Sequence, residues 1–90
     1  MSEPGWRILY TKQGLKDKKT ACANGFKPKI DSLLEILRKN PFEPYPPYEK
    51  LAGDLAGAYS RRVNREHRLV YAVHKDERVV KIISAWEHYE

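Results

Sequence analysis

The chain has 90 residues, enough for one domain and too few for two, and its 41% hydrophobic content with ten aromatic side chains (two Trp, six Tyr, two Phe) argues against disorder. Seventeen basic residues against twelve acidic ones give a net charge of +5. This favours polyanionic partners such as nucleic acid, although many small soluble proteins are as basic without a specific reason. The single cysteine excludes an internal disulfide, and no Cys/His cluster has the spacing of a zinc site.

The first half of the sequence predicts one strand followed by two helices. Residues 6–11 are rich in aromatic and branched side chains and predict the strand. Residues 12–24 predict a lysine-rich, weakly amphipathic helix that stops at Gly25. A second helix is predicted by apolar residues at helical spacing, and a stiff proline-rich loop follows it over residues 41–47. The apolar stripe of that helix comprises Phe26, Ile30, Leu33, Leu34 and Leu37.

The second half of the sequence predicts three strands over residues 58–63, 68–74 and 79–86. Short polar turns separate them, which favours an antiparallel meander. The order of strand, two helices and three strands predicts an α+β fold in which the helices cover one face of a largely antiparallel sheet. We therefore expect residues 1–90 to form a single domain.

Four arginines and a histidine crowd the segment from Tyr59 to Tyr71. Arginine suits phosphate because its planar, permanently charged fork donates two parallel hydrogen bonds. Strand alternation turns Arg62 away from Arg61 and puts Arg68 on the face of Val70 and Ala72. Only some of the four arginines can therefore point into one site. A solvated, salt-bridged surface is the alternative for each of them. Tyr59 is a candidate for stacking on an RNA base, with core packing as the alternative.

Glu49 and His88 are candidates for acid–base catalysis. RNA supplies its own nucleophile, the 2′-hydroxyl, so cleavage needs a base, a cation for the phosphate and an acid for the leaving 5′-oxygen, without a metal or cofactor. Glu49 follows the prolines with Lys50 beside it, and His88 lies in an aromatic segment at the end of the sequence. The spacing leaves open whether the two meet. Of the other histidines, His67 is predicted to cap a turn and His74 to be solvated.

Three linked motifs resemble the Txe/YoeB family of toxins within the RelE-like fold. They are Leu-Ala-Gly-Ala-Tyr-Ser-Arg-Arg-Val over residues 55–63, Glu-His-Arg-Leu-Val-Tyr-Ala-Val over residues 66–73, and the closing His88-Tyr89. The resemblance is close from Pro41 to Tyr89 and concerns only the layout before it. It implies the toxin of a type II toxin–antitoxin pair, an endoribonuclease that cuts mRNA in the ribosomal A site.

The resemblance also implies a role for individual residues. Carried over by position, Glu49 is the general base, Arg68 the phosphate-stabilising cation, His88 the general acid and Tyr89 the residue that positions RNA. The implied products are a 2′,3′-cyclic phosphate and a 5′-hydroxyl end, formed without a metal. The residues expected to bind substrate are Lys50, Arg62, Arg61 and Tyr59.

The implied partners are mRNA, the 70S ribosome and a YefM-type antitoxin, with operator DNA bound only through the antitoxin complex. A homodimer in the cytoplasm, without a membrane, is expected; the amino terminus lacks the pattern of a signal peptide. Two departures are Ala52, where YoeB-type toxins have a lysine, and Glu90, which follows the tyrosine that usually ends the family's chains. The alternatives are a basic module that binds RNA, the ribosome or the antitoxin with little or no cleavage, and a purely structural interaction protein.

Overall fold

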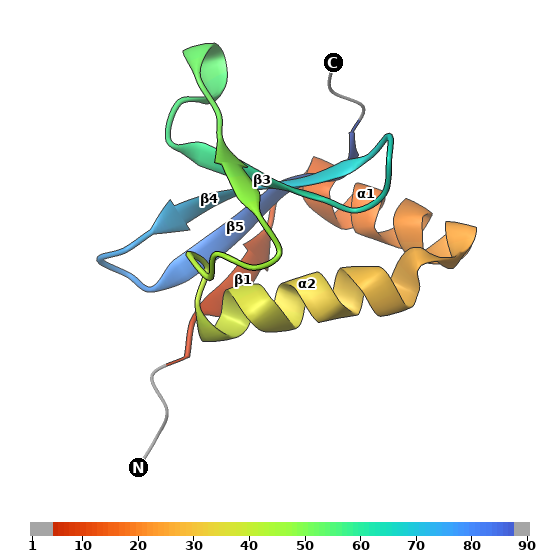
Figure 1. Ribbon diagram of the computed structural model, residues 1–90, viewed down its shortest axis with the longest axis horizontal. Coiled ribbons are helices and arrows are strands. Elements are labelled where there is room, and N and C mark those ends of the chain that lie inside the picture. The colour runs from red at the N-terminus through yellow and green to blue at the C-terminus, as the bar shows by residue number, and fades with distance from the viewer. Residues whose placement is uncertain (1–4, 88–90) are drawn as a thin grey trace.

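The structure is a computed structural model, and it describes residues 5–87, without the side chain of Glu87. Two α-helices lie against one face of a five-stranded sheet (Figure 1). Neither helix is long and apolar enough to cross a membrane, within the residues described. The elements are β1 (Arg7–Tyr10), α1 (Lys12–Ala21), a π-helical turn (Cys22–Phe26), α2 (Lys27–Lys39), β2 (Tyr48–Lys50), a 3-10 turn (Gly53–Leu55), β3 (Ala58–Arg62), β4 (Arg68–His74) and β5 (Val79–Glu87).

The strands lie in the order β1-β5-β4-β3-β2. Strands β2 to β5 pair antiparallel with their neighbours, while β1 pairs parallel with β5, with Arg7 opposite Val79. The α+β prediction is confirmed, including the two helices and the three-stranded meander. The short strand β2 was not predicted, because three residues after a run of prolines carry too little alternation to indicate a strand.

The start of α1 is fixed against β5. The Thr11 hydroxyl oxygen accepts a hydrogen bond from the backbone N–H of Gly14 at 2.9 Å and donates to the carbonyl of Ile83 at 3.0 Å. Gly14 is buried, and a Cβ atom at this position would collide with the carbonyl oxygen of Ile82. A side chain at residue 14 would therefore push α1 away from the strand that leads to the end of the chain.

The second helix supplies most of the helical contribution to the core. The chain turns at Gly25, whose φ of 91° is in the left-handed region, and Pro28 lies in the first turn of α2. The helix ends at Asn40, in front of Pro41, as predicted. Four residues of its apolar stripe are buried against the sheet in one cluster with strand residues, while Phe26, the first residue of the predicted stripe, lies in the π-helical turn and is partly buried. This cluster includes Ile30, Leu33, Leu34, Leu37, Leu69, Tyr71, Val80 and Ile82.

Candidate active site

Three adjacent strands bring a carboxylate, a guanidinium group and a hydroxyl together. Glu49 on β2 lies opposite Ser60 on β3, and the neighbouring Arg62 lies opposite Arg68 on β4. The Nη1 atom of Arg68 is 3.2 Å from Oε1 of Glu49 and 3.2 Å from Oγ of Ser60. The side chain of Arg68 is 20% exposed and that of Glu49 is 64% exposed. The cation is thus held from two sides, while the carboxylate remains accessible.

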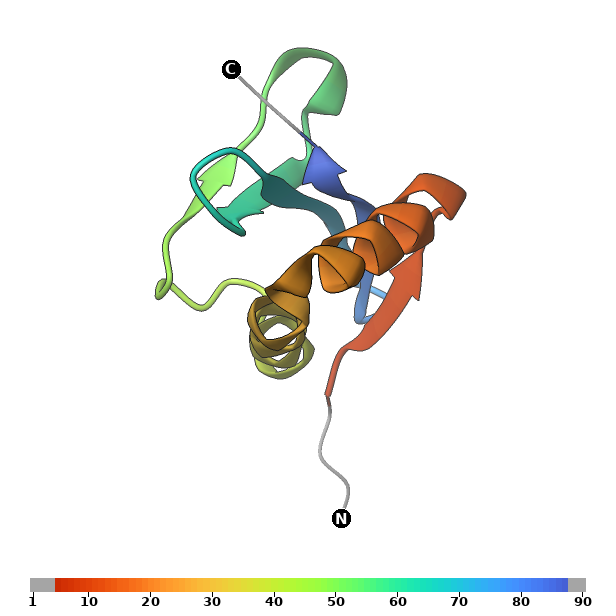
Figure 2. The same cartoon turned by 90° about the vertical axis from the view of Figure 1, so that its right-hand side faces the viewer.

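A cavity of about 510 Å³ opens beside this pair. Its walls come from the first turns of α2, the prolines before β2 and the turn between β3 and β4, which lie on the same side of the molecule (Figure 2). Within residues 5–87, the charged lining residues are four cations and one carboxylate, and the carboxylate is already paired with Arg68. Such a cavity attracts anions. The charged residues are Lys29, Glu49, Arg62, Arg65 and Arg68.

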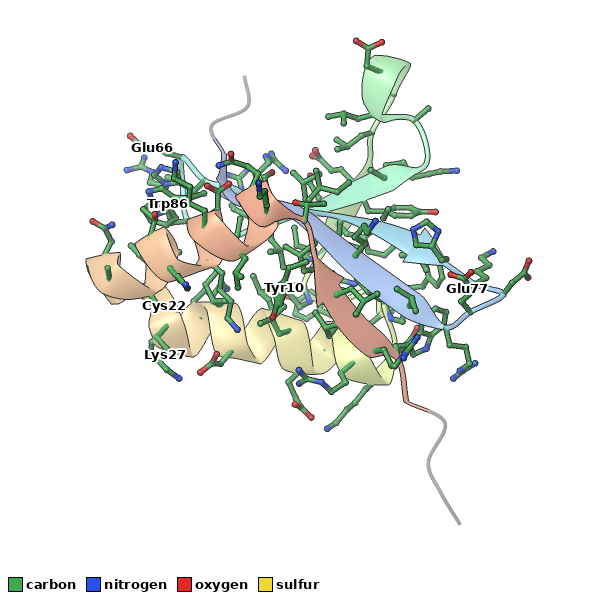
Figure 3. The ribbon with its side chains drawn as sticks, turned by 180° about the vertical axis from the view of Figure 1, so that it is seen from behind. Tyr10, Cys22, Lys27, Glu66, Glu77 and Trp86 are labelled. Atoms are coloured by element: carbon green, nitrogen blue, oxygen red, sulfur yellow. The ribbon has the colours of Figure 1, made fainter. Side chains whose placement is uncertain are left out.

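The end of β5 reaches the same site. Glu87 pairs with Arg68 in the register of β4 and β5, and the side chain of Trp86 lies at the end of the molecule that carries Glu66 (Figure 3). The predicted residues His88 and Tyr89 follow directly in the chain and lie outside the described residues. The chain therefore enters its last three residues from a position beside Arg68.

Asn64 and His67 together hold the turn between β3 and β4. The Oδ1 atom of Asn64 accepts hydrogen bonds from the backbone N–H groups of Glu66 at 2.8 Å and His67 at 2.7 Å. The imidazole ring of His67 stacks on Trp86, with ring centroids 3.7 Å apart and an interplanar angle of 3°. The Nδ1 atom of His67 lies 3.2 Å from the same Oδ1 atom of Asn64, so the side chain takes part in the turn, in agreement with the prediction, and its ring also joins this turn to β5.

Arg61 was predicted to bind substrate, and this prediction was wrong. Its side chain is completely buried, so no phosphate can reach the guanidinium group. All of its nitrogen atoms donate hydrogen bonds inside the protein, which fix the proline-rich loop before β2. The acceptors are the hydroxyl of Tyr71 at 2.9 Å and the carbonyls of Pro41 at 3.0 Å, Glu43 at 2.8 Å and Pro46.

Tyr59 and Lys50 also lie outside the site. The ring of Tyr59 contacts those of Phe42, Tyr48 and Tyr71 with centroid distances of 5.6, 5.5 and 5.9 Å, so the alternative of core packing applies to it. Lys50 is opposite Tyr59 in the register, and strand alternation turns it away from the face of Glu49. Neither residue lines the cavity.

Three site residues were missed by the sequence reasoning. Ser60 and Arg65 belong to the arginine-rich segment from Tyr59 to Tyr71, but their spacing does not indicate that they lie in the site. Lys29 lies twenty residues before Glu49 in the sequence and on a different element. Only the packing of α2 against the face of the sheet brings it to the cavity.

Burial of the Tyr71 side chain raises the pKa of its hydroxyl to about 12, and the positive charge and hydrogen bond of Arg61 only partly oppose this effect. An unfolded tyrosine has a pKa of about 10, so the folded state binds the proton of Tyr71 more tightly than the unfolded state does. The protonated hydroxyl therefore contributes to the free energy of unfolding below pH 10, and this contribution is lost as the pH rises toward 12. We expect a loss of about 2–3 kcal/mol in this range. Tyr71→Phe should remove this part of the pH dependence.

The measurement is urea unfolding at pH 8 and at several values between pH 10 and 12. Tyr45, which is 78% exposed, provides the control Tyr45→Phe, which should keep the alkaline loss of the parent. If Tyr71→Phe loses as much stability as the parent over this interval, the buried hydroxyl is not its source.

Comparison with known proteins places this geometry in a family. The sequence model of the family described as YoeB-like toxin of bacterial type II toxin-antitoxin system matches residues 10–89. Toxin YoeB of Streptomyces coelicolor is 35% identical over 85 residues, which cover 92% of this chain and 99% of that one. A chain of the YoeB-YefM complex from Staphylococcus aureus is 39% identical, with a TM-score of 0.77. The match covers 93% of the present protein and 98% of that chain.

The YoeB dimer from Staphylococcus aureus is 38% identical, with a TM-score of 0.79 and the same shares of the two chains covered, 93% and 98%. The similarity therefore extends over almost the whole length of both proteins, in sequence and in fold. It includes the strands that carry Glu49 and Arg68. The chain belongs to the YoeB family of toxins from bacterial type II toxin–antitoxin systems.

Proposed function

We propose that this toxin is an endoribonuclease that cuts mRNA in the A site of the 70S ribosome by attack of the RNA 2′-hydroxyl. The observation that carries the proposal is the Glu49–Arg68 pair at the border of a cationic cavity. A base and a phosphate-binding cation are the two groups that the first half of such a cleavage needs at one phosphodiester. Membership of the toxin family supports the same conclusion.

In the proposed mechanism, Glu49 removes the proton of the 2′-hydroxyl, and the 2′-oxygen forms a bond to the adjacent phosphorus. Arg68 then donates its hydrogen bonds to the non-bridging phosphate oxygens, where negative charge increases in the transition state. When the guanidinium group of Arg68 exchanges its contact with Glu49 for one with the phosphate, its hydrogen bond to Ser60 keeps it in place. Arg62, which also lines the cavity, contributes a further positive charge to phosphate binding.

The second half of the reaction breaks the bond between phosphorus and the 5′-oxygen, and His88 donates a proton to that oxygen. Its assignment is supported by the family resemblance and by the register that ends β5 beside Arg68. Tyr89 positions the RNA in this proposal. The products are a 2′,3′-cyclic phosphate and a 5′-hydroxyl end, and no metal takes part.

We further propose that the toxin acts in the cytoplasm and forms a homodimer, as its relative from Staphylococcus aureus does. A YefM-type antitoxin neutralises it, and operator DNA is bound through that complex. The relative found in a complex with YefM supports this partner. A cationic cavity is a suitable target for an acidic segment of an antitoxin.

The proposal is tested by mapping mRNA ends after induction of the toxin. Induction of the parent should stop growth and produce new 5′ ends inside coding regions, whereas Glu49→Ala and His88→Ala should produce neither. Matched controls are Glu77→Ala and His74→Ala. Glu77 lies in the turn between β4 and β5, and His74 ends β4, at the opposite end of that strand from Arg68. The controls should behave as the parent does.

If Glu49→Ala and His88→Ala stop growth as strongly as the parent and leave the same ends, the catalytic assignment is wrong. If all variants stop growth and none produces new ends, the chain is a basic binding module without cleavage activity. A second test is the neighbouring reading frame, where the proposal expects a short acidic protein encoded just upstream.

A further inference from the structure

Two cations in the cavity have no task in the proposed cleavage. Lys29 projects from the first turns of α2, and Arg65 lies in the turn between β3 and β4. Both residues are exposed. Within residues 5–87, neither side chain has a hydrogen bond, an ion pair or a ring contact. Two other cations of α2 do have such partners, since Lys27 pairs with Asp31 and Arg38 with Glu35.

The charges of the cavity do not balance without a ligand. Among the described residues, Glu49 is its only carboxylate and is paired with Arg68, so the positive charges of Lys29, Arg62 and Arg65 remain. Like charges around one cavity repel one another, and a bound anion removes this repulsion. The cavity of about 510 Å³ lies in the size range of ligand sites, and it is larger than a single phosphate group requires.

The backbone positions of both cations are well fixed. Lys29 precedes Ile30, which is completely buried in the core. Arg65 follows Asn64, the residue whose side chain holds the turn, and the carbonyl of Arg65 accepts a hydrogen bond from Arg62 at 3.4 Å. Two long cationic side chains on fixed backbone positions can reach an anion without reorganising the protein.

We propose that Lys29 and Arg65 form a second phosphate subsite, which binds the RNA phosphate next to the one that is cleaved. This inference rests on the proposed function, since the Glu49–Arg68 pair takes the scissile phosphate. The ligand is therefore single-stranded RNA with at least two consecutive phosphate groups. Lys29 and Arg65 touch no reacting atom, so they affect binding of RNA and not the chemical step.

The subsite is tested by binding of 2′-O-methyl dinucleotides, which have no 2′-hydroxyl at the linkage and are not cleaved. The ligands are a dinucleotide with its single internal phosphate, and the same molecule with an extra phosphate at the 5′ end or at the 3′ end. Affinities are measured by NMR titration at several salt concentrations. Comparison of the two extended ligands shows on which side of the scissile phosphate the subsite lies.

For the parent protein, we expect one of the two extra phosphates to tighten binding about threefold to tenfold, as two exposed ion pairs would together. The slope of log K against log salt should become steeper by about 0.7, as one more single-strand phosphate contact predicts. The variant with both Lys29→Gln and Arg65→Gln should lose both effects. The charge-preserving variant with Lys29→Arg and Arg65→Lys should retain them.

The control variant combines Lys39→Gln and Arg7→Gln, which remove the same charge from exposed positions away from the cavity, and it should respond to the extra phosphate as the parent does. The proposal is overturned if neither extra phosphate tightens binding to the parent. It is also overturned if the Lys29→Gln, Arg65→Gln variant keeps the tightening and the steeper slope. Either result leaves the cleavage proposal intact, because that proposal depends on mRNA ends in the Glu49 and His88 variants.

Discussion

Arg61→Met should lower the free energy of unfolding by about 3–5 kcal/mol, because it removes a fully buried guanidinium group that donates to one hydroxyl and three carbonyl groups. Methionine fills much of the same space but leaves three carbonyl oxygens and the Tyr71 hydroxyl without their partner. The contact of the guanidinium group with the Tyr48 ring, 4.9 Å from its centroid, is lost as well. For a domain of this size, such a loss is a large part of the total stability.

The measurement is urea unfolding followed by tryptophan fluorescence, with Arg62→Met as the matched control. Arg62 is the next residue and is exposed, so its replacement should change the stability by about 0.5 kcal/mol or less. Equal stability of the two variants would contradict the structural role of Arg61. The same experiment separates the two neighbouring arginines, which the sequence alone assigned together to substrate binding.

Arg68→Ala should lower the rate constant of mRNA cleavage on the 70S ribosome by about 10² to 10³, as loss of a single donor to a developing oxyanion does in other enzymes. Its ion pair with Glu49 is largely exposed on the carboxylate side, so the variant should lose little stability, about 1 kcal/mol or less. The measurement is a single-turnover assay at saturating toxin, which reports the chemical step and not RNA affinity.

Arg7→Ala is the control for this assay, since Arg7 is an exposed arginine on β1 at the opposite edge of the sheet from β2. It should cleave at the rate of the parent. Arg68→Lys should retain part of the activity, because lysine keeps the charge but lacks the planar fork that binds Ser60 and phosphate together. If the rate constant of Arg68→Ala is within a factor of about two of the parent's, the decrease is far smaller than the loss of an oxyanion donor causes. This result would exclude Arg68 from the mechanism.

Much of the fold could be predicted because its signals are local. The apolar spacing from Ile30 to Leu37 determines which face of α2 packs on the sheet, and all residues of that stripe are buried. Alternation in the predicted strands separates Arg61 from Arg62, and the structure agrees, since Arg61 is buried and Arg62 is exposed.

The rest depends on contacts between distant segments. Alternation shows that Arg61 and Arg62 face opposite sides, but only the folding of the proline-rich loop over β3 determines that Arg61 is the buried one. Lys29 lines the cavity because of how α2 packs on the face of the sheet, and the spacing of the helix residues does not indicate this packing. His88 and Tyr89 lie outside the described residues, so their roles stay predictions.

The central claim, that this site cleaves RNA through the 2′-hydroxyl, is tested most directly with a message in the ribosomal A site that carries one 2′-deoxynucleotide at the cleavage position. The all-RNA message should be cut to a 2′,3′-cyclic phosphate and a 5′-hydroxyl end, and the substituted message should stay intact at that position in the same single-turnover assay. Cleavage of the substituted message at the same position and rate would show that the 2′-oxygen is not the nucleophile, and would contradict the role given to Glu49.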